Sequence, residues 1–368
     1  MSQAETRENE LASAPIGRLL FKMALPCITA QIINALYNIV DRMYIGRMEG
    51  TGKTALAGVG IAFPLIMIIS AFAYLIGQGG APLASIKLGE QRKDYAEKIL
   101  SQCFVTMLGI SAVLMAVIYL VKTPLLVAFG ASDATLPYAE DYLSIYLLGT
   151  FFVQISLGMN FFVTAQGFAS VSMRTTLIGA VVNIILDPLF IFVFGMGVKG
   201  AAIATVIAQA ASAVWVLTFM FGKKTTLRIR KEYVRPQWQI LKPVIALGLS
   251  PFIMNVTESA IQIVFTSGMQ KYGGDDYVSV VSLLVTCMSV LTMPMMGLCQ
   301  GAQPITSYNY GAGNSGRVRG TFRLLIICNA IYCVALWGLI QLFPTVVIRL
   351  FSSDVTLLDI GAHGARIF

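Results

Sequence analysis

Apolar residues run along most of this chain in stretches of about twenty, separated by short polar segments. The stretch Val181–Val193, for example, is broken only by Asn183, Asp187 and Pro188. Runs of this length are typical of helices that cross a membrane. The pattern predicts membrane-spanning helices at residues 20–46, 55–86, 96–121, 138–161, 173–196, 200–221, 239–270, 277–300 and 320–342, and a last one beginning near residue 355.

The composition supports this prediction. Of the 368 residues, 57% are hydrophobic and 12% are charged, whereas about a quarter of the residues in soluble proteins are charged. The net charge of +8 comes from Lys and Arg between the apolar runs, so we expect a lipid bilayer as partner and no nucleic acid. If the N-terminus is cytoplasmic, most of these basic residues lie on the cytoplasmic side of the membrane. The sequence therefore predicts a multi-pass protein of the bacterial cytoplasmic (inner) membrane with its N-terminus inside.

The chain also resembles itself at three places, in the same order and about 221 to 225 residues apart. Leu25-Pro26 matches Ser250-Pro251, QGGAPLASIKLG (78–89) matches QGAQPITSYNYG (300–311), and SDAT (132–135) matches SDVT (353–356). Each repeat holds six helices, so both copies face the same way and are related by a pseudo-two-fold axis along the membrane normal.

The predicted fold is therefore an all-α integral membrane protein of two six-helix bundles, the second of them truncated in this chain. Residues 1–19 form a cytoplasmic tail and 20–221 the first lobe, with helices 1–6. Residues 222–237 form a cytoplasmic linker, and 238–368 an incomplete second lobe with helices 7–10. A ten-helix protein is the alternative, and we expect a monomer.

Three acidic residues lie within the predicted spans away from the helix ends, where a carboxylate costs about 3 kcal/mol. The first, Asp41, shares a helix face with Asn34 and Asn38 through i, i+4, i+7 spacing. This favours a functional acid, although an ion pair with neighbouring Arg42 is the alternative.

The second acid, Asp187, follows Asn183 by one helical turn, and Pro188 leaves the carbonyl of Ile184 without its usual donor. Carboxylate, amide and bare carbonyl are the ligands that a proton or a hard cation prefers. The alternative is a proline kink with Asp187 hydrogen-bonded to a neighbouring helix.

The third acid, Glu258, has Asn255 and Gln262 near it on one face. It is a candidate for the lining of a substrate cavity, as are Asn34, Asn38, Asn255 and Gln262. A buried hydrogen bond between the lobes is the alternative. No Lys or Arg lies deep in a span, so the interior favours cationic organic substrates.

Catalytic patterns are missing from the sequence. His363 is the sole histidine, and no Walker A motif occurs. We therefore expect no enzyme activity and no cofactor, and we expect an ion gradient to supply the energy for transport.

The chain resembles the multidrug and toxic compound extrusion (MATE) transporters over nearly its whole length. The resemblance rests on the repeat, on YNIVDRMYIG (37–46), NIILDP (183–188) and GAAIATVIAQ (200–209), and on the paired QGxxP loops. It implies two six-helix lobes and drug export by antiport with Na⁺ or H⁺. It also implies a cation or proton site made of Asp41, Asn183, Asp187 and Thr205, and matches Glu258 to a helix 7 glutamate of another branch. A lipid-linked oligosaccharide flippase is the second possibility, and a membrane enzyme or receptor the third.

Overall fold

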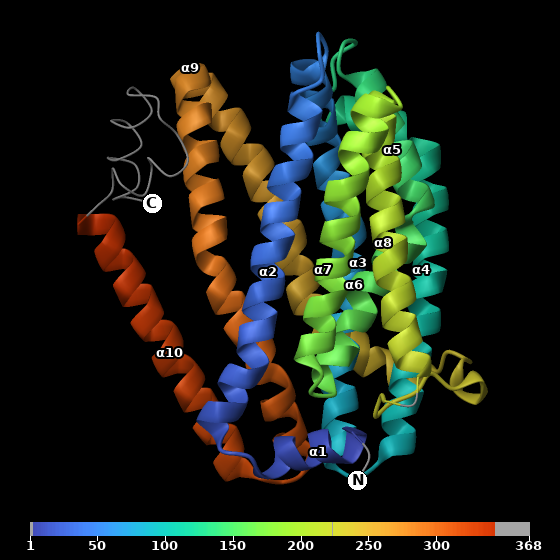
Figure 1. Cartoon of the computed structure of the whole chain (residues 1–368), viewed down its shortest axis with the longest axis vertical. Helices are drawn as coiled ribbons and strands as arrows, with labels where there is room; N and C mark the ends of the chain where they lie inside the picture. The colour runs from blue at the N-terminus through green and yellow to red at the C-terminus, as the bar shows by residue number, and fades with distance from the viewer. Residues whose placement is uncertain (1–2, 223, 343–368) are drawn as a thin grey trace.

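The computed structural model describes the backbone of residues 3–222 and 224–342, and their side chains except those of residues 3–5, 259 and 262–290. Every regular element within these ranges is helical (Figure 1), which confirms the all-α prediction. Seven of the described helices are long and apolar enough to cross a membrane, or eight if one bent pair is counted as a span. The span predicted to begin near residue 355 lies outside the described residues.

The first half of the chain forms a bundle around α3. Its long helices run nearly side by side in Figure 1, and a short helix, α1, lies across their lower ends. The helices of this half are α1 (Gln3–Ser13), α2 (Ile16–Gly46), α3 (Gly52–Gly89), α4 (Lys93–Ala128), α5 (Leu136–Leu148), α6 (Thr150–Ala165), α7 (Ala169–Pro188), the π-helical turn η1 (Leu189–Val193) and α8 (Gly197–Phe221).

Two predicted spans are interrupted in the structure, each for a local reason. The span predicted at 138–161 is divided into α5 and α6, which are bent by 60° at Gly149, where a helix is weakened by about 1 kcal/mol relative to alanine. The span predicted at 173–196 leaves the α-helical geometry after Pro188 and continues as the π-helical turn. Proline lacks the N–H that would continue the ladder, so the hydrogen bonding shifts there.

The second half begins with α9 (Trp238–Gly311) and continues with α10 (Ser315–Leu342) after a linker that contains one 3₁₀ turn, η2 (Lys231–Tyr233). Helices predicted at 239–270 and 277–300 are one unbroken helical stretch, α9, which folds back on itself at the top of Figure 1. The contacts of α9 with α3 require α9 to fold back, because a straight 74-residue helix would place its two ends about 110 Å apart. Gly248 and Gly311 nevertheless both touch α3, at Leu75 and Ile86.

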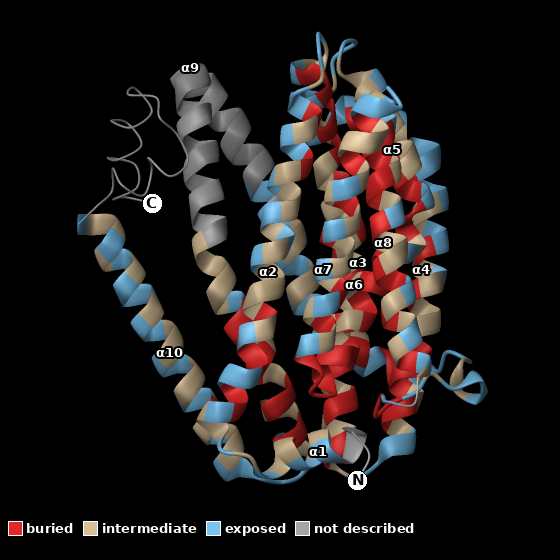
Figure 2. Ribbon diagram, in the orientation of Figure 1, coloured by how far each residue is buried: buried red, intermediate tan, exposed pale blue. Residues whose placement is uncertain are grey.

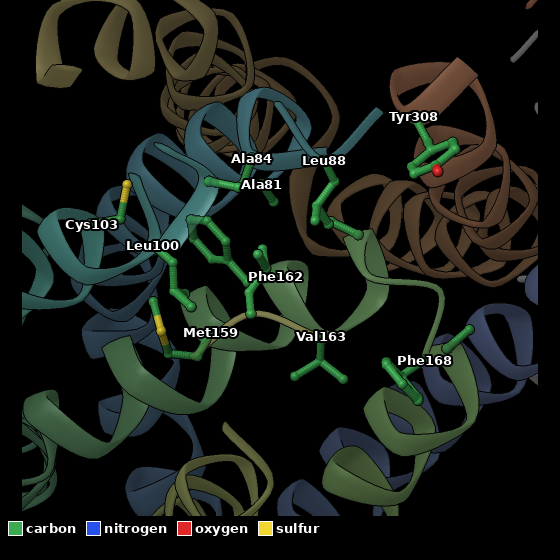
Figure 3. Close-up of a cluster of buried hydrophobic side chains, with 14 of the residues drawn as sticks. Ala81, Ala84, Leu88, Leu100, Cys103, Met159, Phe162, Val163, Phe168 and Tyr308 are labelled. Atoms are coloured by element: carbon green, nitrogen blue, oxygen red, sulfur yellow. The ribbon is translucent and has the colours of Figure 1, made fainter. Parts of the chain in front are cut away.

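Buried residues concentrate in the first-half bundle and in the lower parts of α2 and α9, whereas α10 is exposed along most of its length (Figure 2). Figure 3 shows the centre of the lower cluster, where Phe162 of α6 lies among residues of α3 and α4. Tyr308 of α9 belongs to the same cluster. Small residues such as Ala81 and Ala84 let these helices approach closely. The lower ends of the two halves are therefore packed together.

Candidate functional site

Asp41 comes from the upper part of α2 and is buried, with 8% of its surface exposed. Its neighbour Arg42 is directed elsewhere, because its guanidinium lies 4.7 Å from the centre of the Phe63 ring. Asn38 donates to the carbonyl of Asn34 at 2.6 Å and so completes a bond within its own helix. Of the three polar residues predicted on this face, only Asp41 enters the site.

Asn183 and Asp187 face the same point from α7, where both are fully buried. The Asn183 Nδ2 atom lies 3.2 Å from Asp187 Oδ1 and 3.4 Å from Thr205 Oγ1 of α8. Thr205 donates to the Ala201 carbonyl at 3.0 Å, which fixes its hydroxyl oxygen toward the amide. The one-turn spacing within α7 explains why amide and carboxylate meet.

The Asp41 and Asp187 carboxyl groups lie within hydrogen-bonding reach of each other. The structure thus brings together all four residues of the predicted site, from α2, α7 and α8. Three oxygens at this point, Asp41 Oδ1, Asp187 Oδ2 and Asn183 Oδ1, are buried without a hydrogen-bond partner among the described residues. Two carboxylates in contact inside a protein cannot both be charged without a compensating cation. The arrangement suits a proton or a small hard cation such as Na⁺, which prefers oxygen ligands.

Two tyrosines that were not among the predicted site residues complete this cluster. The side chains of Tyr37 and Tyr142 both lie close to the Thr205 side chain. Tyr37 precedes Asp41 by one helical turn, so helical spacing alone could have identified it. Tyr142 comes from α5, and its ring packs on Tyr146 with 6.2 Å between the centroids. No local spacing relates Tyr142 to the acids.

A cavity lies directly below this cluster, with about 900 Å³ of empty space that includes open solvent. Its wall on α2 is a single stripe of Cys27, Ala30, Gln31, Asn34 and Tyr37, spaced to continue upward to Asp41. The remaining lining is uncharged and rich in hydroxyl and amide groups, from Tyr74, Ser156, Leu157, Asn160, Phe161, Thr164, Ser172, Thr175, Thr176, Gly179, Ala180, Ala208, Gln209, Ser212 and Gln300.

Among the predicted cavity residues, Asn34 lines this space, and Asn38, Asn255 and Glu258 are not in its wall. Glu258 is exposed on α9, and the Asn255 side chain donates to the Pro251 carbonyl at 2.7 Å. The Gln262 side chain lies outside the described residues. Across the described part of the chain, no three His, Cys, Asp or Glu side chains gather into a metal-binding group, so the Asp41–Asp187 pair relies on neutral oxygens for further ligands.

Comparisons with known proteins agree with this architecture. The family model MatE matches residues 26–189 and 251–368. The multidrug export protein MepA of Staphylococcus haemolyticus is 26% identical over 363 residues, which cover 95% of this chain and 79% of MepA. A MOP superfamily transporter from Pyrococcus furiosus superposes with a TM-score of 0.89 at 22% identity, over 97% of this chain and 79% of the other. A MATE crystal structure in the bent conformation gives 0.89 at 23% identity, over 98% and 79%. These two likenesses describe the fold alone.

Proposed function

Since this chain belongs to the MatE family of membrane transporters, we propose that it exports small organic molecules by antiport with a cation, H⁺ or Na⁺, bound between Asp41 and Asp187. The multidrug export activity named for the MepA relatives supports export as the direction. As a family member the protein is a transporter and not an enzyme. All site residues come from one chain, so we propose a monomer as the transport unit.

One observation carries this proposal: a single helix face holds both the cavity wall and the acid. The α2 stripe from Cys27 to Tyr37 lines the cavity, and Asp41 follows one turn above it. Any change in the position of α2 therefore alters the cavity and the acidic pair together. Coupling requires that cargo binding and ion binding act on the same structural element. We propose α2 as this element, because it contributes to both sites.

The proposed cycle uses the flexibility of α2. Pro26 lies inside this helix, and its missing N–H leaves a point where the helix bends easily. When a cation neutralises the Asp41–Asp187 pair, α2 repacks against α7 and reduces the cavity. Bound cargo then leaves outward, and release of the cation to the cytoplasm restores the first arrangement.

We further propose cationic, amphipathic cargo and a bacterial cytoplasmic membrane with the N-terminus inside. The described residues of the cavity wall carry no formal charge, and the charges that Tyr37 adjoins are the two acids, so the local field favours a positive guest. A lipid-linked oligosaccharide would need basic groups for its pyrophosphate, and the part of the cavity wall that the structure describes offers none. Export of drugs is thus better supported than lipid-linked sugar flipping.

Transport assays in proteoliposomes test the proposal directly. The purified protein is reconstituted, loaded with a fluorescent organic cation, and given a Na⁺ gradient or a pH gradient in separate experiments. We expect efflux to follow one of the two gradients and to stop when the matching ionophore collapses it. Efflux that is the same with and without either gradient would contradict antiport.

Replacement of Tyr37 by Phe tests the connection between cavity and acids. The substitution removes the hydroxyl that meets Thr205 and keeps the ring that lines the cavity. Loss of a polar contact of this kind costs up to about 1 kcal/mol, so we expect efflux slowed by up to about fivefold at an unchanged cargo affinity. Tyr44→Phe, on the same helix and in edge contact with Phe192, is the control and should leave efflux unchanged.

A further inference from the structure

The polar segment before the first span is not an extended tail. Residues Gln3–Ser13 form α1, which lies at the lower end of both halves in Figure 1. The carbonyl of Leu11 accepts hydrogen bonds from Asn309 Nδ2 of α9 at 3.0 Å and from Arg317 Nη2 of α10 at 3.2 Å. Arg317 also donates to the Ala14 carbonyl at 2.8 Å. The second half of the chain thus caps the C-terminal end of α1.

The opposite side of α1 rests on the first half. Leu11 is 98% buried, with 2% of its surface exposed, and packs near Gly167 of the α6–α7 turn. The guanidinium of Arg7 lies 5.8 Å from the centre of the Phe168 ring. Glu10 binds Lys22 of α2 at 2.8 Å. Burial of Glu10 would raise its pKa, but hydrogen bonds from Lys22 and Arg7 outweigh that effect and lower the pKa below its usual value.

Arg317 occupies an unfavourable position for its own helix. It stands in the first turn of α10, where the helix dipole disfavours a positive charge. Its Nε atom is buried without a hydrogen-bond partner among the described residues. The hydrogen bonds to the end of α1, where the dipole favours a cation, offset this cost. The contact with α1 therefore accounts for an arginine here.

The linker before α9 makes the corresponding contacts: it leads into the second half of the chain and is bound by residues of the first half. Glu97 of α4, with only 1% of its surface exposed, accepts from the Arg228 backbone at 3.2 Å and from Arg230 Nε at 2.8 Å. Ser101 and Gln102, also on α4, accept from the backbone N–H groups of Arg230 and Gln237. Gln166, at the end of α6, accepts from Thr225, Thr226 and Leu227.

The two attachments occupy corresponding places in the internal repeat. Glu97 and Arg317 are about 220 residues apart in the sequence, which is close to the spacing of the repeat. Each lies near the start of the third predicted span of its half, 96–121 or 320–342. Each binds the segment that leads into the first helix of the other half: α1 before α2, and the linker before α9. Two segments therefore bridge the halves at one end of the molecule.

We propose that α1 and the linker segment Thr225–Gln237 are paired straps that hold the cytoplasmic ends of the two halves together, with Arg317 and Glu97 as their positioning residues. The proposal rests on the transport function proposed above, because the straps must release once in each cycle for the cavity to open toward the cytoplasm. Neither residue lines the cavity, so both act on the rate of opening and not on contacts with the cargo.

Reversible cross-linking tests whether α1 must move. The six native cysteines are replaced in a variant that still transports, and Ser13→Cys and Ser315→Cys are introduced at exposed positions beside the Arg317 contact. A short bifunctional methanethiosulfonate should stop multiple-turnover efflux, and a reductant should restore it, whereas a monofunctional reagent should have no effect. Unchanged efflux in the cross-linked protein overturns the strap. Absence of efflux in the wild-type protein would instead count against the proposed function.

A second measurement reports opening without a cross-link. Cys27 lines the cavity and is almost fully buried, so its modification by an impermeant thiol reagent at the cytoplasmic face reports cytoplasmic access. In a variant that keeps only this cysteine, Arg317→Gln should raise the modification rate about tenfold, as expected for loss of charge-assisted hydrogen bonds. Arg317→Lys should restore part of the protection. Arg319→Gln removes the same charge at an exposed position and should change nothing. Equal rates for the two glutamine variants overturn the proposal.

Discussion

Asp187→Asn is expected to abolish ion-driven efflux and to leave the protein folded. The substitution keeps the size of the side chain and its contact with Asn183, but it removes a carboxylate that the proposed cycle requires. Without it Asp41 is the one carboxylate left at the site, so the exchange of the cation between two acids no longer drives α2. We expect efflux at least about a hundredfold slower, which corresponds to about 2.7 kcal/mol or more.

The same substitution should not lower the stability of the protein. It removes one of two buried acids in contact, and thereby the cost of holding them side by side. Thermal unfolding in detergent is expected at the wild-type temperature or slightly above it. Asp141→Asn is the matched control, because Asp141 is a half-exposed carboxylate in a surface pair with Lys199 at 3.4 Å and such pairs contribute little. Wild-type efflux by the Asp187 variant would contradict the assigned role.

Much of this architecture could be predicted from the sequence, because the lipid environment leaves helices as the main solution for long apolar runs. The Asn183–Asp187 pair was predictable for the same reason, since spacing along one helix determines which side chains meet. Thr205 was different. Nothing in its own helix marks it, and it entered only through the resemblance to a family.

Other parts of the site depend on contacts between distant helices, which local spacing does not encode. Glu258 lies in a predicted span and was a candidate for the cavity lining, yet it is exposed on α9 and is not among the residues of the cavity wall. Glu97, near the start of α4, is buried by a linker that follows it by more than a hundred residues. Tyr142 reaches Thr205 only because α5 and α8 pack together. In each case contacts with distant segments, and not spacing along the residue's own helix, determine whether the residue is buried or belongs to the site.

The close approach of α3 and α9 leads to a second large effect, because glycines on both helices allow it. A Cβ atom at Gly248 would lie 1.8 Å from the Leu75 carbonyl oxygen, and one at Gly79 would lie 2.1 Å from the Val244 carbonyl oxygen. At the C-terminal ends of the two helices, Gly311 and Gly89 show the same reciprocal approach to Ile86 and Tyr308. Each obstacle is a backbone oxygen, which cannot rotate away as a side chain can.

Gly248→Leu is therefore expected to prevent the two halves from packing. The added side chain must displace α9 from α3 along its first turns, and overpacking of this kind costs about 3 kcal/mol or more. We expect loss of the monodisperse peak in size-exclusion chromatography and a large fall in yield from the membrane. Gly248→Ala should give a milder fall in unfolding temperature. Gly109→Leu places the same side chain in a helix of the same bundle where no atom lies within 4 Å of the new Cβ, and it should behave as wild type. If the Gly248 and Gly109 variants are equally stable, the close helix contact does not hold the halves together.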